Sequence, residues 1–313
     1  MKVYDMLIVG GGPGGYTAAL YAARAGLSVL VLEKLSAGGQ MALSERIENY
    51  PGFPEGIDGY TLAEQMQAQA ERFGAQTELA EVLALDLRAN PKIVETSEGT
   101  FYGRTVVYAA GAEPRQLGLP MEQALVGRGV SYCAACDGAF YRGKTVAVVG
   151  GGDSAAAEAM HLLPVAKKVI LIHRRDTLRA TKVYHTALTQ AENLEFRWNS
   201  AVTELIYDGR LTGLRLKNTV TGDESSVSCD GVFISVGREP ATALVSSQLS
   251  LDKGGYIVAG ESTRTEIPGV YAVGDVRSKP LRQVVTAVSD GAAAVHSAQG
   301  FLAGLEKTDS LPG

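Results

Sequence analysis

The fold is decided by a stretch near the N-terminus that reads YDMLIVGGGPGGYTAAL, residues 4–20. The apolar run 4–9 predicts a strand, and the alanine-rich run 16–25 predicts a helix just after the glycines. A second apolar run at 28–32 predicts another strand. Strand, glycine-rich turn, helix and strand in this order indicate a βαβ unit of the kind that binds dinucleotides.

The glycine pattern gives each of its positions a task. We expect Gly10 to make the tight turn, Gly12 to let the backbone approach a pyrophosphate, and Gly15 to allow close helix packing. Pro13 lies between these glycines and is assigned to the same phosphate-binding turn. A lone G-x-G-x-x-G pattern is weak evidence, because ordinary glycine turns also join strands to helices.

The pattern recurs in TVAVVGGGDSAAAEAM, residues 145–160. The run 145–149 predicts a strand, the alanine-rich run to about residue 163 a helix, and 168–172 the next strand. The turn positions of this second copy are Gly150, Gly152, Asp153, Ser154 and Ala155. Both copies lie between a predicted strand and a predicted helix, which argues against ordinary glycine turns. The sequence therefore predicts an α/β protein with two Rossmann-like dinucleotide-binding domains.

The two copies differ at the end of their second strand, where a dinucleotide ribose is bound. Glu33 lies 23 residues after the first glycine, and its carboxylate can accept hydrogen bonds from a ribose 2′-hydroxyl. His173 takes the matching position of the second copy and precedes a basic cluster, Arg174, Arg175 and Arg179. Guanidinium groups bind a 2′-phosphate, so this copy predicts NADPH rather than NADH. The alternative is a solvated basic face.

The same pattern predicts the domain plan. A helix is expected between Thr61 as N-cap and Gly74 as C-cap, and each copy later closes on an apolar strand, 106–110 or 232–236. The remaining residues, with a helix at about 284–302, are too few for a third domain and complete the first. The predicted domains are 1–114 with 241–313, and 115–240 inserted between them.

Length, charge and the N-terminal residues limit the function classes. A chain of 313 residues favours two domains, and a net charge of −5 argues against a nucleic-acid or membrane-surface partner. The first strand follows Met1 too closely for a signal peptide, and no transmembrane stretch is present. We therefore expect a cytoplasmic protein without membrane or nucleic-acid partners.

Two of the three cysteines, Cys133 and Cys136, form a C-x-x-C pair just before the second glycine motif. This spacing is typical of a redox-active disulfide. A zinc site would need two more ligands, and neither Cys229, which suits a core position, nor the four histidines provide them at ligand spacing, so no metal is expected. Asp137 follows the pair and is a candidate for the proton transfer of thiol exchange; the alternative is that it caps a helix from Gly138, and it could do both.

With these motifs, the sequence closely resembles bacterial-type thioredoxin reductases. The resemblance rests on the two dinucleotide units, CAACDG at 133–138 and HRRDTLRA at 173–180, and it spans nearly the whole chain. Three further segments resemble that family, namely GGQ at 38–40, ENYPG at 48–52, and Gly274-Asp275 followed by Arg282-Gln283.

The resemblance implies which residues bind FAD. Gln40 and Asn49 would lie near the flavin ring, Asp275 at the ribityl chain, and Arg282 and Gln283 in the flavin pocket. The full set of implied FAD residues is Gly10, Gly12, Pro13, Gly15, Glu33, Lys34, Gly39, Gln40, Asn49, Gly274, Asp275, Arg282 and Gln283.

The resemblance also implies how the redox pair works. Cys136 would sit nearer the flavin, the pair would exchange with thioredoxin, and Asp137 would act as acid and base. The family is homodimeric and rotates its inserted domain, for which hinges near 111–117 and 237–242 would serve. One departure is Ala135, where the family usually has threonine; this change should leave the disulfide intact and bear on redox potential or partner choice.

The motifs, together with this resemblance, predict an NADPH-dependent thioredoxin-disulfide reductase. Hydride would pass from NADPH to FAD, then to the Cys133–Cys136 disulfide, then to a disulfide of thioredoxin or a similar small redoxin. Relatives that use ferredoxin, or flavin with oxygen, should lack the second nucleotide motif, which is intact here. A reductase that serves a peroxide-removing partner and a non-enzymatic flavin redox sensor remain as alternatives.

Overall fold

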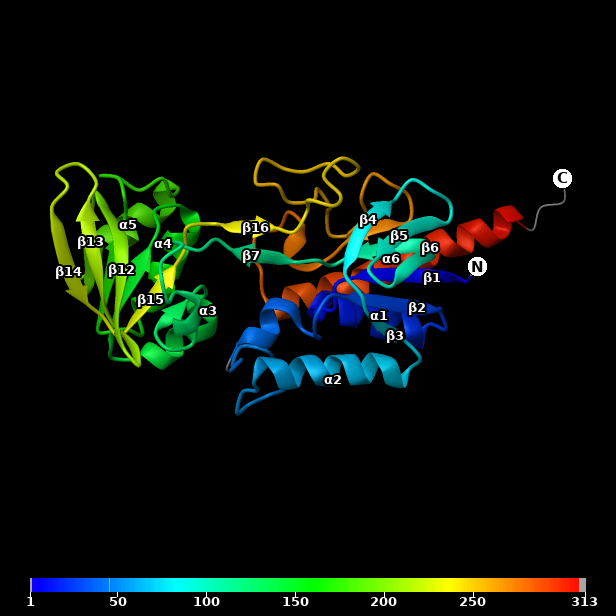
Figure 1. The fold of residues 1–313 in the computed structure, drawn as a ribbon, viewed down its shortest axis with the longest axis horizontal. Coiled ribbons are helices and arrows are strands. Elements are labelled where there is room, and N and C mark those ends of the chain that lie inside the picture. Colours follow the sequence, from blue (N-terminus) through cyan, green and yellow to red (C-terminus); the bar gives the residue numbers. More distant parts are fainter. Residues whose placement is uncertain (1, 45, 310–313) are drawn as a thin grey trace. The chain divides into compact units, whose positions relative to one another are not determined.

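The computed structural model describes residues 2–44 and 46–309 and consists of two compact units (Figure 1). The first unit combines Met1–Glu113 with Glu239–Gly313, and the inserted unit is Pro114–Arg238. A chain of this length divides into units because a single hydrophobic core stops growing at about this size.

The chain passes between the units twice, through β7 (Ala112–Pro114) and β16 (Arg238–Pro240). These two short strands pair with each other in a two-stranded sheet. The chain therefore enters and leaves the inserted unit through two segments that are paired with each other, although they are far apart in the sequence.

A seven-stranded sheet forms the centre of the first unit, with the order β3-β2-β1-β6-β5-β4 and with β17 also paired to β6. Its strands are β1 (Val3–Val9), β2 (Val29–Glu33), β3 (Gln76–Leu79), β4 (Val82–Asp86), β5 (Lys92–Thr96), β6 (Gly99–Tyr108) and β17 (Val270–Ala272). Strands β1, β2, β3, β6 and β17 run parallel, and β4 and β5 extend the sheet antiparallel. In this register Ile8 lies between Val31 and Val107, all fully buried.

Three α-helices belong to the first unit, α1 (Pro13–Arg24), α2 (Gly59–Arg72) and α6 (Val284–Asp309), with 3₁₀ turns η1 (Gly39–Leu43) and η4 (Gly274–Val276). Small residues let α1 and α6 pack closely: a Cβ atom at Gly291 would lie 2.3 Å from the Gly14 carbonyl oxygen. The buried Ala18, Ala22 and Ala294 belong to the same core cluster. This packing holds the start of α1 beside the C-terminal end of β1.

The inserted unit repeats the plan with a parallel sheet of order β11-β10-β9-β15-β8 and a three-stranded antiparallel sheet β12-β13-β14. Its strands are β8 (Val130–Ser131), β9 (Thr145–Val149), β10 (Lys168–Ile172), β11 (Leu194–Arg197), β12 (Ser200–Asp208), β13 (Arg210–Asn218), β14 (Glu224–Ser228) and β15 (Gly231–Ile234). Its helices are α3 (Ala134–Asp137), α4 (Asp153–Leu162) and α5 (Lys182–Gln190), with 3₁₀ turns η2 (Gln123–Leu125) and η3 (Gly138–Tyr141). The α/β prediction with two Rossmann-like domains is confirmed.

Several boundaries differ from the predicted ones. α1 begins at Pro13 rather than residue 16, because proline and glycine are tolerated in the first turn of a helix, where amides lack helical partners. The strands expected at 106–110 and 232–236 end earlier, at Tyr108 and Ile234. α6 runs beyond residue 302 to Asp309.

The N-cap predicted for α2 is wrong. The helix begins at Gly59, and Asp58 is its N-cap, with an Oδ1 atom that accepts from the Thr61 amide at 2.9 Å. Thr61 lies in the first turn of the helix and not before it. Gly74 follows the helix in a left-handed conformation, as expected of a glycine after a C-cap.

The described residues were compared with the requirements of membrane-spanning helices and of metal sites. Across 2–44 and 46–309, none of the helices combines the length and apolar character that crossing a membrane requires. Over the same ranges, no group of three or more His, Cys, Asp or Glu side chains is placed to hold a metal ion.

Candidate active site

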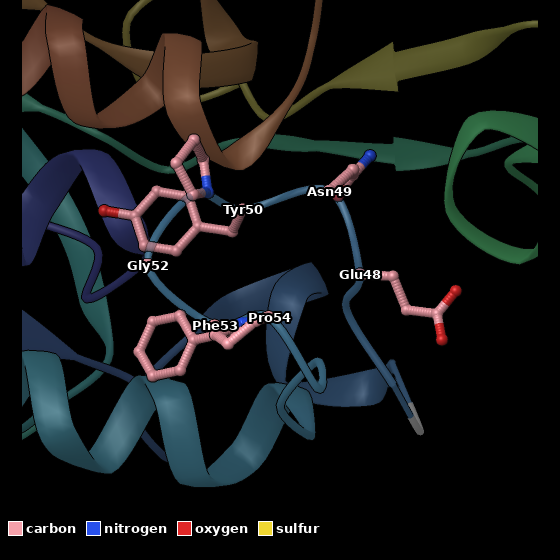
Figure 2. Close-up of a pocket in the computed structure, with 7 residues that line it drawn as sticks. Glu48, Asn49, Tyr50, Gly52, Phe53 and Pro54 are labelled. Carbon is pink, nitrogen blue, oxygen red and sulfur yellow. The ribbon is translucent and has the colours of Figure 1, made fainter.

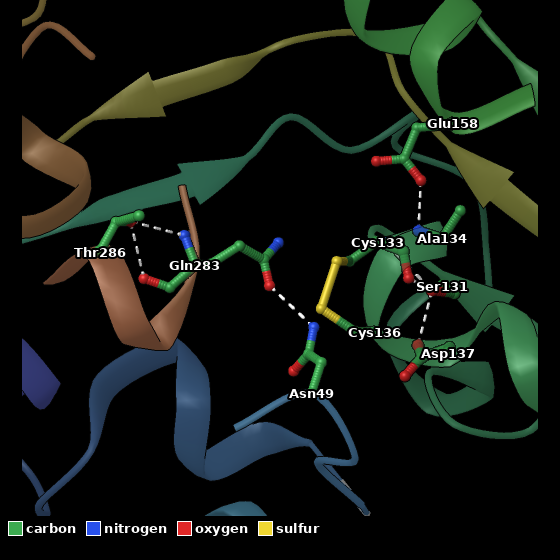
Figure 3. Close-up of a disulfide and its surroundings, with 9 residues drawn as sticks. All are labelled: Asn49, Ser131, Cys133, Ala134, Cys136, Asp137, Glu158, Gln283 and Thr286. Atoms are coloured by element: carbon green, nitrogen blue, oxygen red, sulfur yellow. Dashed lines mark hydrogen bonds between the residues drawn. A yellow bond between two sulfur atoms is a disulfide. The ribbon is translucent and has the colours of Figure 1, made fainter. Parts of the chain in front are cut away.

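The C-x-x-C pair lies in the inserted unit, where Cys133 and Cys136 are joined by a disulfide (Figure 3). Cys133 is the N-cap of the four-residue helix α3, and its carbonyl oxygen accepts from the amides of Cys136 at 3.2 Å and Asp137 at 3.0 Å. Both cysteines are partly exposed, and Ala135 between them is exposed. The disulfide is therefore held in a short helical turn that a partner can approach.

The Asp137 carboxylate is bonded to the segment before the cysteines. Its Oδ2 atom accepts from the Ser131 hydroxyl at 2.6 Å, and the Ser131 Oγ atom accepts from the Cys133 amide at 3.1 Å (Figure 3). Ser131 is buried, so these bonds hold both ends of the redox turn, Cys133 and Asp137, against the interior of the unit. Asp137 is the N-cap residue of η3, but its side chain makes no cap bond there.

Sequence reasoning missed Glu158 on α4. One of its carboxylate oxygens, Oε2, accepts from the amide of Ala134, the residue that follows Cys133 (Figure 3). Burial, with a smaller contribution from the negative Asp137, raises the pKa of Glu158 to about 7, and the bond from the Ala134 amide and the charge of Arg238 oppose the rise. The available signal was a single carboxylate in an otherwise small and apolar helical run directly after the second glycine motif.

Cys229, the third cysteine, is buried in a core cluster, as expected. Burial raises the pKa of its thiol to about 12, so it stays protonated at neutral pH. It takes no part in the exposed redox turn.

The first glycine loop connects β1 to α1 with the geometry that its pattern predicts. Gly10 has φ of +102°, and a Cβ atom there would lie 2.6 Å from the Ala109 carbonyl oxygen. A Cβ atom at Gly15 would lie 2.0 Å from the Gly10 carbonyl oxygen, so only glycine fits between helix and turn. Nothing lies within 4 Å of a Cβ atom at Gly12, the N-cap of α1, which has no side-chain cap.

Glu33 ends β2 beside this loop. Its Oε2 atom accepts from the Gly11 amide at 2.6 Å, and its Oε1 atom accepts from the Lys34 amide at 2.8 Å. The exposed Lys34 side chain instead forms an ion pair with Glu81 at 2.7 Å. Gly39 also lies beside the loop, because its Cβ position would be 3.9 Å from the Gly12 Cα atom.

The second glycine loop connects β9 to α4 in the inserted unit. Space is open around a Cβ atom at Gly152, which is the N-cap of α4 and has no side-chain cap bond. Ala155 is fully buried against the strand, Ser154 is exposed, and Asp153 accepts from the Thr181 amide at 2.6 Å. Both loops thus present an uncapped helix start with an open glycine, which suits a phosphate group.

His173 and the three arginines do not share one environment. His173 is buried beneath the loop, and a Cβ atom at Gly151 would lie 2.2 Å from its ring. Burial lowers the pKa of His173, and the nearby Arg179, Arg175 and Arg174 lower it further, so the ring is neutral at pH 7. The three arginines are exposed, and the Arg179 amide donates to the Gly151 carbonyl at 2.7 Å.

A loop of the first unit, Glu48–Pro54, forms a shallow pocket by itself, which Figure 2 shows. The lining residues are Glu48, Asn49, Tyr50, Pro51, Gly52, Phe53 and Pro54. Tyr50 and Phe53 have stacked rings 6.1 Å apart, and the side-chain amide of Asn49 donates to Gln283 Oε1 at 3.0 Å. The fold thereby brings together two segments that are 234 residues apart.

The remaining predicted residues lie around η4, except for Gln40. The Arg282 side chain donates to the Asp275 carbonyl oxygen at 3.4 Å and lies 3.9 Å above the Tyr256 ring. The Gly274 amide donates to buried Asp290 at 2.9 Å, which is also paired with Arg277 and Lys279. Gln40 is exposed in η1. Within the first unit, the structure thus links Asn49 to Gln283 and Asp275 to Arg282.

Comparison with known proteins gives consistent results. A family model described as pyridine nucleotide-disulphide oxidoreductase matches residues 4–291. The thioredoxin reductase of Streptomyces coelicolor is 45% identical over 310 residues, which cover 98% of this chain and 96% of that protein. The thioredoxin reductase of Listeria monocytogenes is 44% identical over 308 residues, with coverage of 98% and 96%.

A solved structure supports the same assignment. The thioredoxin reductase of Streptococcus pyogenes superposes with a TM-score of 0.89 at 42% identity, and the match covers 96% of this chain and 99% of that one. The chain belongs to the pyridine nucleotide-disulphide oxidoreductase family and, within it, to the thioredoxin reductases.

Proposed function

We propose that this protein is an NADPH-dependent reductase of the thioredoxin disulfide. Electrons would pass as hydride from NADPH to FAD, then to the Cys133–Cys136 disulfide, and then to a disulfide of thioredoxin. The observation that carries the proposal is a partly exposed C-x-x-C disulfide in the same unit as a second dinucleotide loop with three exposed arginines. The relatives named thioredoxin reductase support the same substrate.

The first glycine loop fits the pyrophosphate of FAD. The start of α1 has no side-chain cap, and the space in front of Gly12 is open, so amide groups can bind a phosphate there. Glu33, which already holds the Gly11 amide, is placed to accept from a ribose hydroxyl. The residues that would hold FAD are Gly10, Gly12, Pro13, Gly15, Glu33, Lys34, Gly39, Gln40, Asn49, Gly274, Asp275, Arg282 and Gln283.

The second glycine loop fits NADPH for the same reason. α4 starts without a side-chain cap at the open Gly152, and the exposed arginines can bind a 2′-phosphate. Because His173 is buried and neutral, we propose that it supports the loop while the arginines bind charge. The residues proposed for this site are Gly150, Gly152, Asp153, Ser154, Ala155, His173, Arg174, Arg175 and Arg179.

The catalytic residues are Cys133, Cys136 and Asp137. FAD, when bound, would supply a carrier that accepts a hydride from NADPH and donates two electrons to the disulfide. Reduction breaks the Sγ–Sγ bond, and the two sulfur atoms need protons to become thiols. Asp137 would hold and transfer one of these protons, and its bond to Ser131 keeps the carboxylate next to the redox turn.

Domain bounds, assembly and compartment belong to the same proposal. We propose domains at 1–114 with 241–313 and at 115–240; compact units that divide after residues 113 and 238 support this division. A cytoplasmic location suits a chain with three cysteines, of which one is buried and free. The homodimer rests on family resemblance, and size-exclusion chromatography with light scattering would test it.

The electron path is tested by anaerobic titration with NADPH. The flavin absorbance should bleach, and addition of oxidised thioredoxin should restore it with steady NADPH consumption. Bleaching without turnover would point to a flavin redox sensor, and absence of bleaching would refute the path. Turnover with NADH equal to that with NADPH would refute the role of the arginines.

Another small redoxin is a second candidate substrate. Ala135 is exposed between the cysteines at a position where the family usually has threonine, so a partner would contact it directly. Comparing kcat/KM for several redoxins between wild type and Ala135→Thr tests this candidate. A change of preferred redoxin would favour it, and an unchanged order with thioredoxin first would exclude it.

A further inference from the structure

A second carboxyl group, besides Asp137, reaches the helix that carries the redox pair. Glu158 extends from α4 to α3, and its Oε2 atom accepts from the Ala134 amide, directly after Cys133. Ala134 itself is buried, so this amide has little access to water. The contact joins the nucleotide-loop helix to the redox turn within a single unit.

We propose that Glu158 is a positioning residue that sets the reduction potential of the Cys133–Cys136 pair. Its carboxylate accepts from the Ala134 amide and so places a negative charge at the residue directly after Cys133, which disfavours a thiolate in the redox turn. The relevance of this inference rests on the proposed function, but its test does not use NADPH.

The direction of the effect follows from which redox state carries the charge. A backbone amide or a positive group near a cysteine stabilises the thiolate and lowers the thiol pKa. Stabilising a thiolate stabilises the reduced pair, which makes the disulfide more oxidising. Glu158 does the opposite, because it removes an amide donor and adds repulsion. It therefore makes the reduced pair a better electron donor, which suits delivery of electrons to a partner protein.

The surroundings of Glu158 let its charge change near neutral pH. Burial, with a smaller contribution from Asp137 of α3, raises its pKa to about 7, although the bond from the Ala134 amide and the charge of Arg238 of β16 both lower it. The strands under α4 present buried apolar side chains, among them Val148 and Leu171. In α5 the buried side chain is Leu188, and His185 is bonded through Nε2 to the Ala180 carbonyl.

Reduction of the pair consumes two electrons and up to two protons. Two electrons break the Sγ–Sγ bond and leave two sulfur anions, which take up two protons to become two thiols. Where one sulfur stays a thiolate, only one proton is taken up. The ionised Glu158 favours the first outcome, so its removal should increase the thiolate fraction of the reduced pair above neutral pH.

The test equilibrates the flavin-loaded protein with mixtures of reduced and oxidised dithiothreitol, followed by rapid alkylation and mass measurement. Two added labels report a reduced pair, since the buried Cys229 thiol is protected in the folded protein. The variants are Glu158→Gln, which keeps an acceptor for Ala134, and Glu158→Asp, which keeps the charge. The control is Glu192→Gln, at an exposed carboxylate of the same unit. Flavin content and circular dichroism confirm folding.

At pH 8.5, Glu158→Gln should raise the equilibrium constant for reduction about tenfold, which corresponds to about 30 mV. At pH 5.5 wild type and variant should agree within about twofold, because Glu158 of the wild type is then as uncharged as the glutamine that replaces it. Glu158→Asp and Glu192→Gln should stay within about twofold of wild type at both pH values. An unchanged constant at pH 8.5, or an equal shift at both pH values, would overturn the proposal.

These outcomes separate the inference from the proposed function. If NADPH fails to reduce the protein, the dithiothreitol equilibrium still reports the potential of the pair. If NADPH turnover is normal but the potential does not depend on Glu158, only this inference fails.

Discussion

The Asp137 carboxylate is held beside the redox turn by the Ser131 hydroxyl, and this placement makes it the first side chain to vary. Asp137→Asn keeps the shape but removes the proton-transfer group, so the rate of thioredoxin reduction should fall by about 100-fold. The rate of flavin reduction by NADPH should change less than twofold, because that step does not use Asp137. Stopped-flow absorbance measures both rates.

The matched control is Asp208→Asn, at an exposed carboxylate in the same unit, which should leave both rates unchanged. An equal loss of both rates in Asp137→Asn would indicate damage to the fold rather than a lost proton donor.

The three exposed arginines after His173 determine the nucleotide preference in the proposed function. Arg174→Ala should lower kcat/KM for NADPH by about 10-fold to 100-fold, since a hydrogen bond to a charged group contributes about 1.5–3 kcal/mol. The value for NADH should change little, because NADH lacks the 2′-phosphate. Arg215→Ala, at an exposed arginine paired with Glu204, is the control. A parallel loss for both nucleotides would contradict the assignment.

Individual site residues were predictable where a motif fixes the backbone around them. The positions of Gly10, Gly15 and Gly150 follow from spacing, because a Cβ atom would collide with backbone at each. The Glu158 contact was not predictable, because it joins two residues of different helices, 24 positions apart, through a side chain that no motif requires. The burial of His173 was missed because the motif specifies the chain position and not the depth of the ring.

Among the elements, the packing of α1 on α6 makes a sharp prediction for two glycines in one helix. Gly291→Ala would place a Cβ atom 2.3 Å from the Gly14 carbonyl oxygen and force the helices apart. The free energy of unfolding should fall by about 1–3 kcal/mol, which is typical of overpacking. Urea unfolding followed by circular dichroism measures the change.

Gly300→Ala is the matched control, because nothing lies within 4 Å of its Cβ position. Alanine replaces glycine there inside a helix, so the variant should gain about 0.5–1 kcal/mol of stability. Destabilisation by both substitutions to the same extent would argue against close packing of α1 and α6.

Elements with strong periodicity were predicted well, and their ends less well. β9 and β10 match the apolar runs 145–149 and 168–172 residue for residue. The start of α2 was misplaced because Asp58 and Thr61 both suit an N-cap, and tertiary placement decides between them. β8, with only two residues, leaves no periodic signal in the sequence.

At the scale of the whole molecule, Glu158 makes stability depend on pH. Its pKa of about 7 in the folded protein exceeds the ordinary value of 4.5, so folding disfavours the ionised form. Well below pH 4.5 the group is neutral in both states and does not change the free energy of unfolding. The free energy of unfolding is lowered progressively as the pH rises from about 4.5 to 7, and the loss is complete above that range.

Glu158→Gln removes this cost. The free energy of unfolding of the variant relative to wild type should therefore increase between pH 5 and pH 8, by on the order of 2 kcal/mol. Urea unfolding of the flavin-loaded protein at both pH values measures the difference. A relative stability that falls with pH would contradict the raised pKa.

The short sheet of β7 and β16 determines how the inserted unit is joined to the rest of the chain. The Arg115 amide donates to Gly237 at 3.0 Å, and the Ala241 amide donates to Gly111 at 3.0 Å, so the two strands run in opposite directions. Joined directly, they would be the two arms of a hairpin. Along the chain, the inserted unit therefore takes the place that the turn of a hairpin would have.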